Sequence, residues 1–196
     1  LRIGIDLMGG DRSPTALFEA VLWATQRFPR VNLTVFITQA ALSDIRAASA
    51  GFSSLDPAQV EFQIISDVIE MHDEPLLAIR KKKGSSLVFG LNLLKNKYLD
   101  AFVSAGNTGA LIGAAALSLL PGVKRPALLA VLPTETGTVA VIDVGGNVSC
   151  TASHLVQFAQ LGAAYQQCIG AVARPRIGLL NIGTESKKGT LEVRQA

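Results

Sequence analysis

The chain has 196 residues, of which 49% are hydrophobic and 17% are charged. This apolar content can bury a sizeable core, which excludes an intrinsically disordered chain. The formal net charge of +3 is well below that of typical nucleic-acid-binding domains, so we predict no nucleic-acid partner. The longest apolar stretch, residues 110–120, is shorter than the roughly 20 residues that cross a bilayer. We therefore expect a soluble, cytoplasmic protein, for which peripheral membrane association stays open.

Apolar runs alternate with helical patterns along nearly the whole chain. Short runs rich in β-branched residues predict strands at residues 3–7, 31–37, 60–65, 101–103, 128–132, 139–144 and 177–182. Apolar residues at helical spacing predict helices at residues 15–28, 40–50, 75–82, 86–95, 108–120 and 153–171. Pro75 follows two acidic residues and suits the first position of its helix. The segment between residues 132 and 139 is too short for a helix, so the strands on either side of it suggest a hairpin.

This alternation predicts an α/β protein with three layers, in which helices cover both faces of a largely parallel sheet. The apolar runs of the strands lack strict alternation, as expected when both faces of a sheet are buried. No linker or repeat interrupts the pattern. We expect one α/β domain over residues 1–196.

Four predicted strands end in small polar loops, at residues 6–11, 104–109, 143–147 and 181–185. Ligands of open parallel sheets bind at the carboxyl ends of the strands. Glycines let backbone N–H groups approach a ligand, and a following helix adds its unpaired N–H groups, which suits an anion. A glycine after a strand is commonly only a turn, so each loop alone is weak evidence, and none matches the Walker or the dinucleotide-binding pattern. Together they predict a site for phosphate or carboxylate.

Several polar residues allow two interpretations. Asp11 could cap the turn or the following helix, or contact a ligand, and Asn107 and Asn147 could cap helices or present an amide to an oxyanion. Asp143 ends a buried strand, so its carboxylate needs hydrogen-bond partners. The cysteines Cys150 and Cys168 have neither CxxC nor zinc-site spacing, and we interpret both as reduced core thiols. No motif for a metal or for another cofactor is present, and we predict none.

The chain resembles the bacterial phosphate acyltransferase family, the acyl-carrier-protein:phosphate acyltransferases of phospholipid synthesis. The matching segments follow the order of the family along nearly the whole chain: IDLMGGD, VIEMHDEP, IRKKKGSS, DAFVSAGNTGAL, RPALLAVLP, DVGGNVSC, HLVQFAQLGAAY and RIGLLNIGTESKKG. Among the departures, His72 replaces an acidic residue of the family and Gly84 replaces an aspartate. Family members are about half as long again, so we expect residues 1–196 to be the amino-terminal and central part of a longer family chain.

The resemblance implies an enzyme that converts acyl-[acyl carrier protein] and inorganic phosphate to acyl phosphate and free carrier protein, for glycerophospholipid synthesis. It also implies a homodimer and a fold like that of the phosphotransacetylases and the isocitrate/isopropylmalate dehydrogenases. The reaction suits uncharged glycine loops, because phosphate is already an anion and a thiolate is a good leaving group, with a thiol pKa of roughly 8.5. Positioning and oxyanion stabilisation are then what the protein must supply.

These considerations predict three groups of site residues. The predicted catalytic residues, which stabilise the oxyanion or screen charge, are Asn107, Asn147, Asn181 and Lys187, with Lys188 as an alternative to Lys187. The predicted phosphate-binding and substrate-binding residues are Asp6, Gly9, Gly10, Asp11, Ser104, Gly106, Thr108, Gly109, Asp143 and Gly183. The predicted docking residues for the acidic carrier protein are Arg80, Lys81, Lys82 and Lys83; a solvated helix end is the alternative for this run.

Two other functions remain compatible with the sequence. A phosphotransacetylase that uses acyl-coenzyme A would need the same phosphate loops. A non-catalytic scaffold could retain the fold and bind membrane or synthesis partners. Assays for acyl phosphate, with carrier protein and coenzyme A compared as acyl donors, distinguish these functions.

Overall fold

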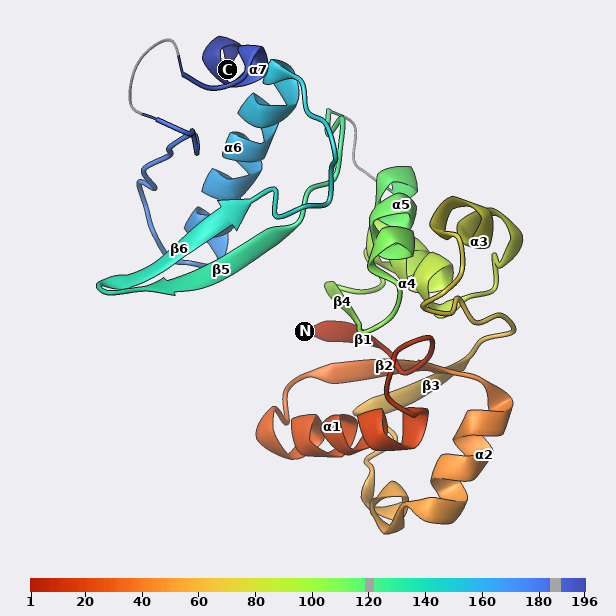
Figure 1. Ribbon diagram of the computed structural model, residues 1–196. Coiled ribbons are helices and arrows are strands. Elements are labelled where there is room, and N and C mark those ends of the chain that lie inside the picture. Colours follow the sequence, from red (N-terminus) through yellow and green to blue (C-terminus); the bar gives the residue numbers. More distant parts are fainter. Residues whose placement is uncertain (119–121, 184–187) are drawn as a thin grey trace. The chain divides into compact units, whose positions relative to one another are not determined.

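The computed structural model describes residues 1–118, 122–183 and 188–196. The chain divides into two compact units, Leu1–Leu120 and Pro121–Ala196. Each unit has its own sheet and helices (Figure 1), and the single domain expected over residues 1–196 stays a prediction. Among the described residues, no helix combines the length and the apolar composition that crossing a membrane requires.

The first unit is built on a four-stranded sheet in which every pair of neighbouring strands is parallel. The strands, in sheet order, are β3 (Val60–Ile64), β2 (Asn32–Ile37), β1 (Arg2–Asp6) and β4 (Ala101–Ser104). Asp6 at the end of β1 lies opposite Phe36 of β2 and Ser104 of β4. All four carboxyl ends therefore lie along one edge of the sheet.

Helices cover both faces of this sheet (Figure 1). On one face lie α1 (Pro14–Arg27) and α2 (Gln39–Ala48), followed by a short 3-10 helix at Ala50–Ser54. Their apolar side chains form a core with β1, β2 and β3 that includes Phe18, Val21 and Ile45. On the other face lie α3 (Pro75–Lys81), α4 (Ser86–Lys95) and α5 (Thr108–Ser118), whose core includes Ile79 and Leu91. This arrangement confirms the predicted three-layer α/β fold with a parallel sheet.

Local signals explain where these helices begin. The side chains of Ser13, Thr38 and Ser85 accept hydrogen bonds from backbone N–H groups three residues ahead, as N-caps do. Pro75 occupies the predicted first position of α3, behind the Glu74 cap. The helix-capping role considered for Asp11 is wrong, because Ser13 caps α1.

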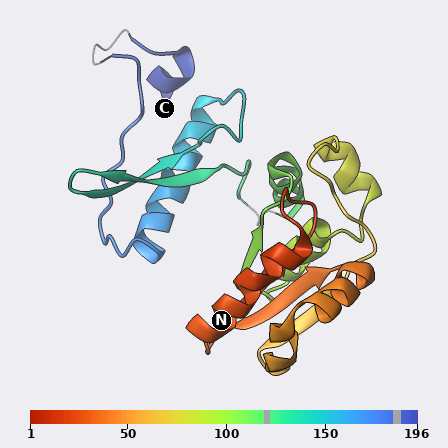
Figure 2. The ribbon, with the colours of Figure 1, turned by 60° about the horizontal axis from the view of Figure 1, so that its bottom comes forward.

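The second unit contains the predicted hairpin, an antiparallel pair of β5 (Leu129–Thr134) and β6 (Gly137–Ile142). The long helix α6 (Ala152–Cys168) lies along one face of this hairpin (Figure 2), and α7 (Leu191–Gln195) packs against α6. Thr151 and His154 form a capping box at the start of α6, which gives this histidine a structural role. Cys150 is partly buried and Cys168 is exposed, so the interpretation of Cys168 as a core thiol is wrong.

The strand predicted at residues 177–182 is wrong. This segment has no strand conformation, and its side chains Ile177, Leu180 and Ile182 are 59%, 91% and 86% exposed. A parallel strand exists only through hydrogen bonds to a neighbour, and within the described residues this run pairs with none. An apolar run thus has the composition of a strand, but it does not determine whether a neighbouring strand is available for pairing.

Candidate functional site

The order of the strands locates a ligand site between β1 and β4. Chain connections run from β1 through β2 to β3 on one side, and β4 joins β1 on the other side. Such a switch point opens a crevice at the carboxyl ends of the two strands, where ligands of open α/β sheets bind. The loops that follow β1 and β4 meet there: a Cβ atom added to Gly10 would lie 3.0 Å from the carbonyl oxygen of Ala105.

The side chain of Asp6 connects these two loops by hydrogen bonds. Its side chain is buried, with Oδ1 accepting from Met8 N at 2.9 Å and Oδ2 accepting from Ser104 Oγ at 2.8 Å. Ser104 Oγ in turn accepts from Gly106 N at 3.1 Å. Burial raises the pKa of Asp6, while hydrogen bonds from Met8, Ser86 and Ser104 oppose that rise. The carboxylate oxygens thus bond to protein donors and shape the loops on both sides of the crevice.

Asn107 is buried at the start of α5 and uses both ends of its side-chain amide. Its Oδ1 accepts from Ala110 N at 2.9 Å, which caps the helix. Its Nδ2 lies 3.2 Å from each of the carbonyl oxygens of Glu70, Met71 and Asp73. Asn107 therefore fastens the loop before α3 to the loop after β4.

Two glycines of α5 allow α3 to pack closely against it. A Cβ atom on Gly109 would lie 2.8 Å from Pro75 Cγ, and one on Gly113 would lie 2.7 Å from Ile79 Cδ1. Both distances are shorter than normal carbon contacts. Gly109, which was expected to face phosphate, thus also has a packing role that the sequence did not reveal.

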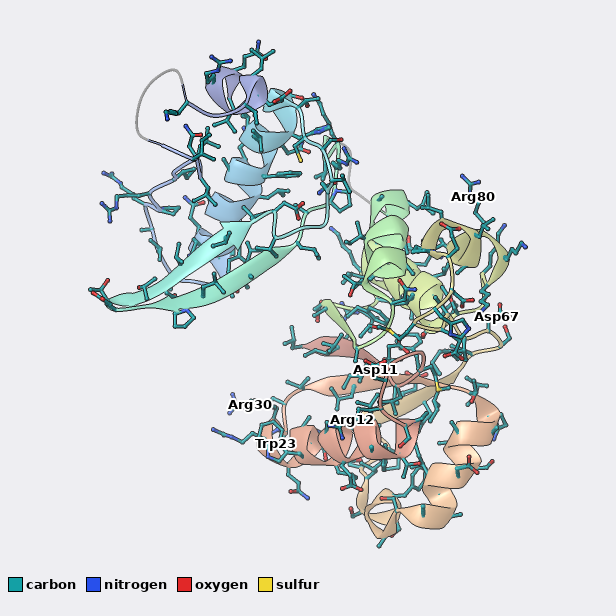
Figure 3. The ribbon with its side chains drawn as sticks, viewed as in Figure 1. Asp11, Arg12, Trp23, Arg30, Asp67 and Arg80 are labelled. Carbon is teal, nitrogen blue, oxygen red and sulfur yellow. The ribbon has the colours of Figure 1, made fainter. Side chains whose placement is uncertain are left out.

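The first turn of α5 leaves donors for an anion. Thr108 and Gly109 are exposed, and within the described part of the chain their N–H groups bond to no acceptor. Unpaired N–H groups at the start of a helix attract anions through their partial positive charge. Asp11, on the neighbouring loop, is also exposed (Figure 3). The arrangement can hold a small anion by backbone contacts.

The predicted residues Asp143 and Asn147 lie in the second unit, where they bond to each other. Asp143 accepts from the backbone N–H groups of Leu128, Gly146 and Asn147 and from Asn147 Nδ2, at 2.7 to 3.1 Å. Asn147 Nδ2 also donates to the Pro126 carbonyl at 3.0 Å. Partial burial acts to raise the pKa of Asp143, but the hydrogen bonds outweigh it and leave the pKa below its ordinary value.

This lowered pKa predicts a pH-dependent loss of stability. Asp143 contributes stability in full above its unfolded pKa, near 4, and loses it as the pH falls through the lower folded value. We expect Asp143→Asn to lower the urea midpoint at pH 7 and to differ progressively less from the wild type toward pH 2. Asp44→Asn, at an exposed position of α2, controls for the loss of one charge. A difference that stays constant with pH would contradict the prediction.

The remaining predicted residues belong to both units. Asn181 is exposed and donates from Nδ2 to the Lys188 carbonyl at 3.2 Å, while its Oδ1 accepts from Ile182 N at 2.9 Å. Gly183 is partly buried, and Lys187 lies outside the described residues. In the basic run, Lys82 forms an ion pair with Asp73, which holds the pKa of Asp73 below its ordinary value. This ion pair joins a residue just before α3 to a residue just after it, and it was not expected from the sequence.

Neither metal ligands nor the sheet's other edge offers a better site. In residues 1–118, 122–183 and 188–196, no three His, Cys, Asp or Glu side chains cluster as metal ligands would. A hollow of about 300 Å³ opens at the amino-terminal edge of the strands. Two of its polar side chains are already engaged: Arg2 pairs with Asp100 at 3.0 Å, and Gln59 Nε2 donates to three backbone carbonyls. We therefore place the site at the carboxyl edge.

Comparison with known proteins identifies the family. The profile of the family described as "Fatty acid synthesis protein" matches residues 1–196. The chain belongs to this family. Its similar relatives include proteins named phosphate acyltransferase from Thermoanaerobacter pseudethanolicus (39% identical over 198 residues) and Chlamydia pneumoniae (44% identical over 200 residues). Each alignment covers all of this chain but only 57% and 62%, respectively, of the relative. The chain thus spans less than two thirds of the length of these relatives.

Proposed function

We propose that the protein carrying this chain transfers an acyl group from the thioester of acyl-[acyl carrier protein] to inorganic phosphate. A phosphate oxygen bonds to the acyl carbon, the carbon–sulfur bond breaks, and acyl phosphate and the free thiol of the carrier result. The name shared by the relatives supports this reaction, as does the family itself. The observation that carries the proposal is the pair of N–H groups at Thr108 and Gly109, which lie at the switch point of the sheet and bond to no acceptor within the described residues.

The residues fall into two roles under this proposal. The N–H groups of Thr108 and Gly109 hold phosphate, and Asp6, Ser104 and Asn107 keep the loops around them in shape. Phosphate needs no strong base, so positioning provides most of the rate enhancement. The expectation that Asn147 and Asn181 position the acyl group or the oxyanion, and that Lys187 or Lys188 screens charge, stays a prediction. A homodimer and peripheral membrane association stay predictions.

Thr108→Pro tests the anion site in the full-length protein. Proline at the first helical position removes one N–H group and fits the helix, as Pro14 and Pro75 do at the starts of α1 and α3. We expect about a hundredfold lower kcat/KM for phosphate, the effect of losing one positioned donor. Acyl phosphate is trapped with hydroxylamine and measured as the hydroxamate.

Thr108→Ala is the matched control, because it removes the hydroxyl group and keeps the N–H group. It should react within about threefold of the wild type, since the N–H donor is retained. Equal kinetics for Thr108→Pro and Thr108→Ala would remove this N–H group from the phosphate site. If the wild-type protein forms no hydroxamate from acyl-[acyl carrier protein] or from acyl-coenzyme A, the proposed acyltransferase activity is wrong.

A further inference from the structure

The outer face of α3 is unusually apolar for an exposed helix. α3 buries Ala78 and Ile79 against its neighbours, while Leu76 and Leu77 stay 57% and 51% exposed. Met71, just before the helix, is 45% exposed. Large exposed apolar residues that adjoin one another mark interaction sites. Packing within the first unit therefore leaves more than half of each of the two leucines exposed.

The same face carries positive charge. Arg80 and Lys81 follow the two leucines at a spacing of four residues, which places each pair on one side of the helix. Both basic side chains are exposed, and Arg80 projects away from α3 (Figure 3). Lys82 differs, because its ammonium group is paired with Asp73. We call Leu76, Leu77, Arg80 and Lys81 the α3 face.

The α3 face is held next to the proposed phosphate site. Asn107, which caps α5, bonds to the carbonyl groups of the loop that leads into α3. Gly109, whose N–H group is proposed to bind phosphate, lies against Pro75 at the start of α3. Gly113 lets Ile79 pack one turn further along. A partner bound to the α3 face would thus stand beside the loop where phosphate is proposed to bind.

We propose that the α3 face docks the acyl carrier protein, with Leu76 and Leu77 as the apolar centre and Arg80 and Lys81 as the charged rim. This inference rests on the proposed function and narrows the docking residues to one helix face. The carrier is acidic, so a basic rim provides charge complementarity and directs the partner's approach. A membrane surface fits less well, since interfacial helices bury a longer apolar face than the two leucines of this seven-residue helix.

Binding of fluorescently labelled carrier protein to the full-length protein tests the inference without depending on catalysis. We expect Arg80→Glu/Lys81→Glu to weaken binding about tenfold at low salt, with a smaller difference at high salt because ions screen exposed charges. Leu76→Ser/Leu77→Ser should weaken binding about tenfold at every salt concentration, because apolar contacts are not screened. The KM for acyl-[acyl carrier protein] should rise in parallel, while the KM for phosphate should stay unchanged.

Matched variants elsewhere on the first unit serve as controls. Lys95→Glu/Lys97→Glu reverses two exposed charges at the end of α4, and Trp23→Ser removes a large side chain that is 60% exposed. Both should bind carrier like the wild type. Unchanged carrier binding in both α3 variants would overturn the inference. It would also be overturned if these variants lost binding to anionic vesicles while their binding to the carrier stayed intact. Hydroxamate formation by the wild type reports separately on the proposed function.

Discussion

Asn107→Ala is expected to destabilise the first unit by about 3 kcal/mol, because it removes a helix cap and the amide donor that three carbonyl groups of the loop before α3 share. The bonds at risk are those from Asn107 Nδ2 to the carbonyls of Glu70, Met71 and Asp73, and the bond from Ala110 N to Oδ1. Urea unfolding measures the loss of stability. The KM for phosphate should rise as well, since the first turn of α5 would lose its anchor.

Two further variants separate the roles of Asn107. Asn107→Asp keeps the oxygen that caps α5 and replaces the donor Nδ2 with a second oxygen. Because this oxygen cannot donate to the carbonyl groups, the variant should release the loop at residues 70–73 while α5 still forms. Asn92→Ala, at an exposed position of α4, should change stability by less than about 0.5 kcal/mol. If Asn107→Ala unfolds like Asn92→Ala and keeps the wild-type KM, the fastening role of Asn107 is wrong.

Gly9→Ala is expected to be comparably damaging, for a reason that lies in the backbone. Gly9 has φ of +74°, and an added Cβ atom would collide with the carbonyl oxygen of Ile69. The left-handed conformation alone costs a non-glycine residue about 1–3 kcal/mol, and the collision forces the loop after β1 away from residue 69. Strain and collision together should therefore lower the free energy of unfolding by about 3 kcal/mol or more. If the crevice moves by about an ångström, turnover should fall roughly a hundredfold.

Gly145→Ala isolates the conformational part of this effect. Gly145 also has a positive φ, of +96°, but an added Cβ atom there would meet no heavy atom within 4 Å. Its unfolding free energy should therefore fall by about 1–2 kcal/mol, from strain alone. Equal losses for Gly9→Ala and Gly145→Ala would show that the contact with Ile69 is unimportant.

Short-range patterns in the sequence were enough to predict most helices and strands. The helix over residues 86–95 and the proline start of α3 agree with the structure residue for residue. The hairpin of β5 and β6 also followed from the length of its connection. Periodicity, caps and turn residues act within a few neighbours along the chain, so a single sequence displays them directly.

Contacts between distant segments decided the rest. The sequence suggested that Asn107 caps a helix or binds a ligand, but only the fold shows its amide facing the loop at residues 70–73. Likewise, only the fold shows that Asp73 pairs with Lys82. Residues 177–182 have the composition of a strand and yet form none among the described residues. The physical reason is common to all three: a buried amide, an ion pair and a sheet strand each need a partner, and the position of that partner is set by tertiary packing rather than by neighbouring residues.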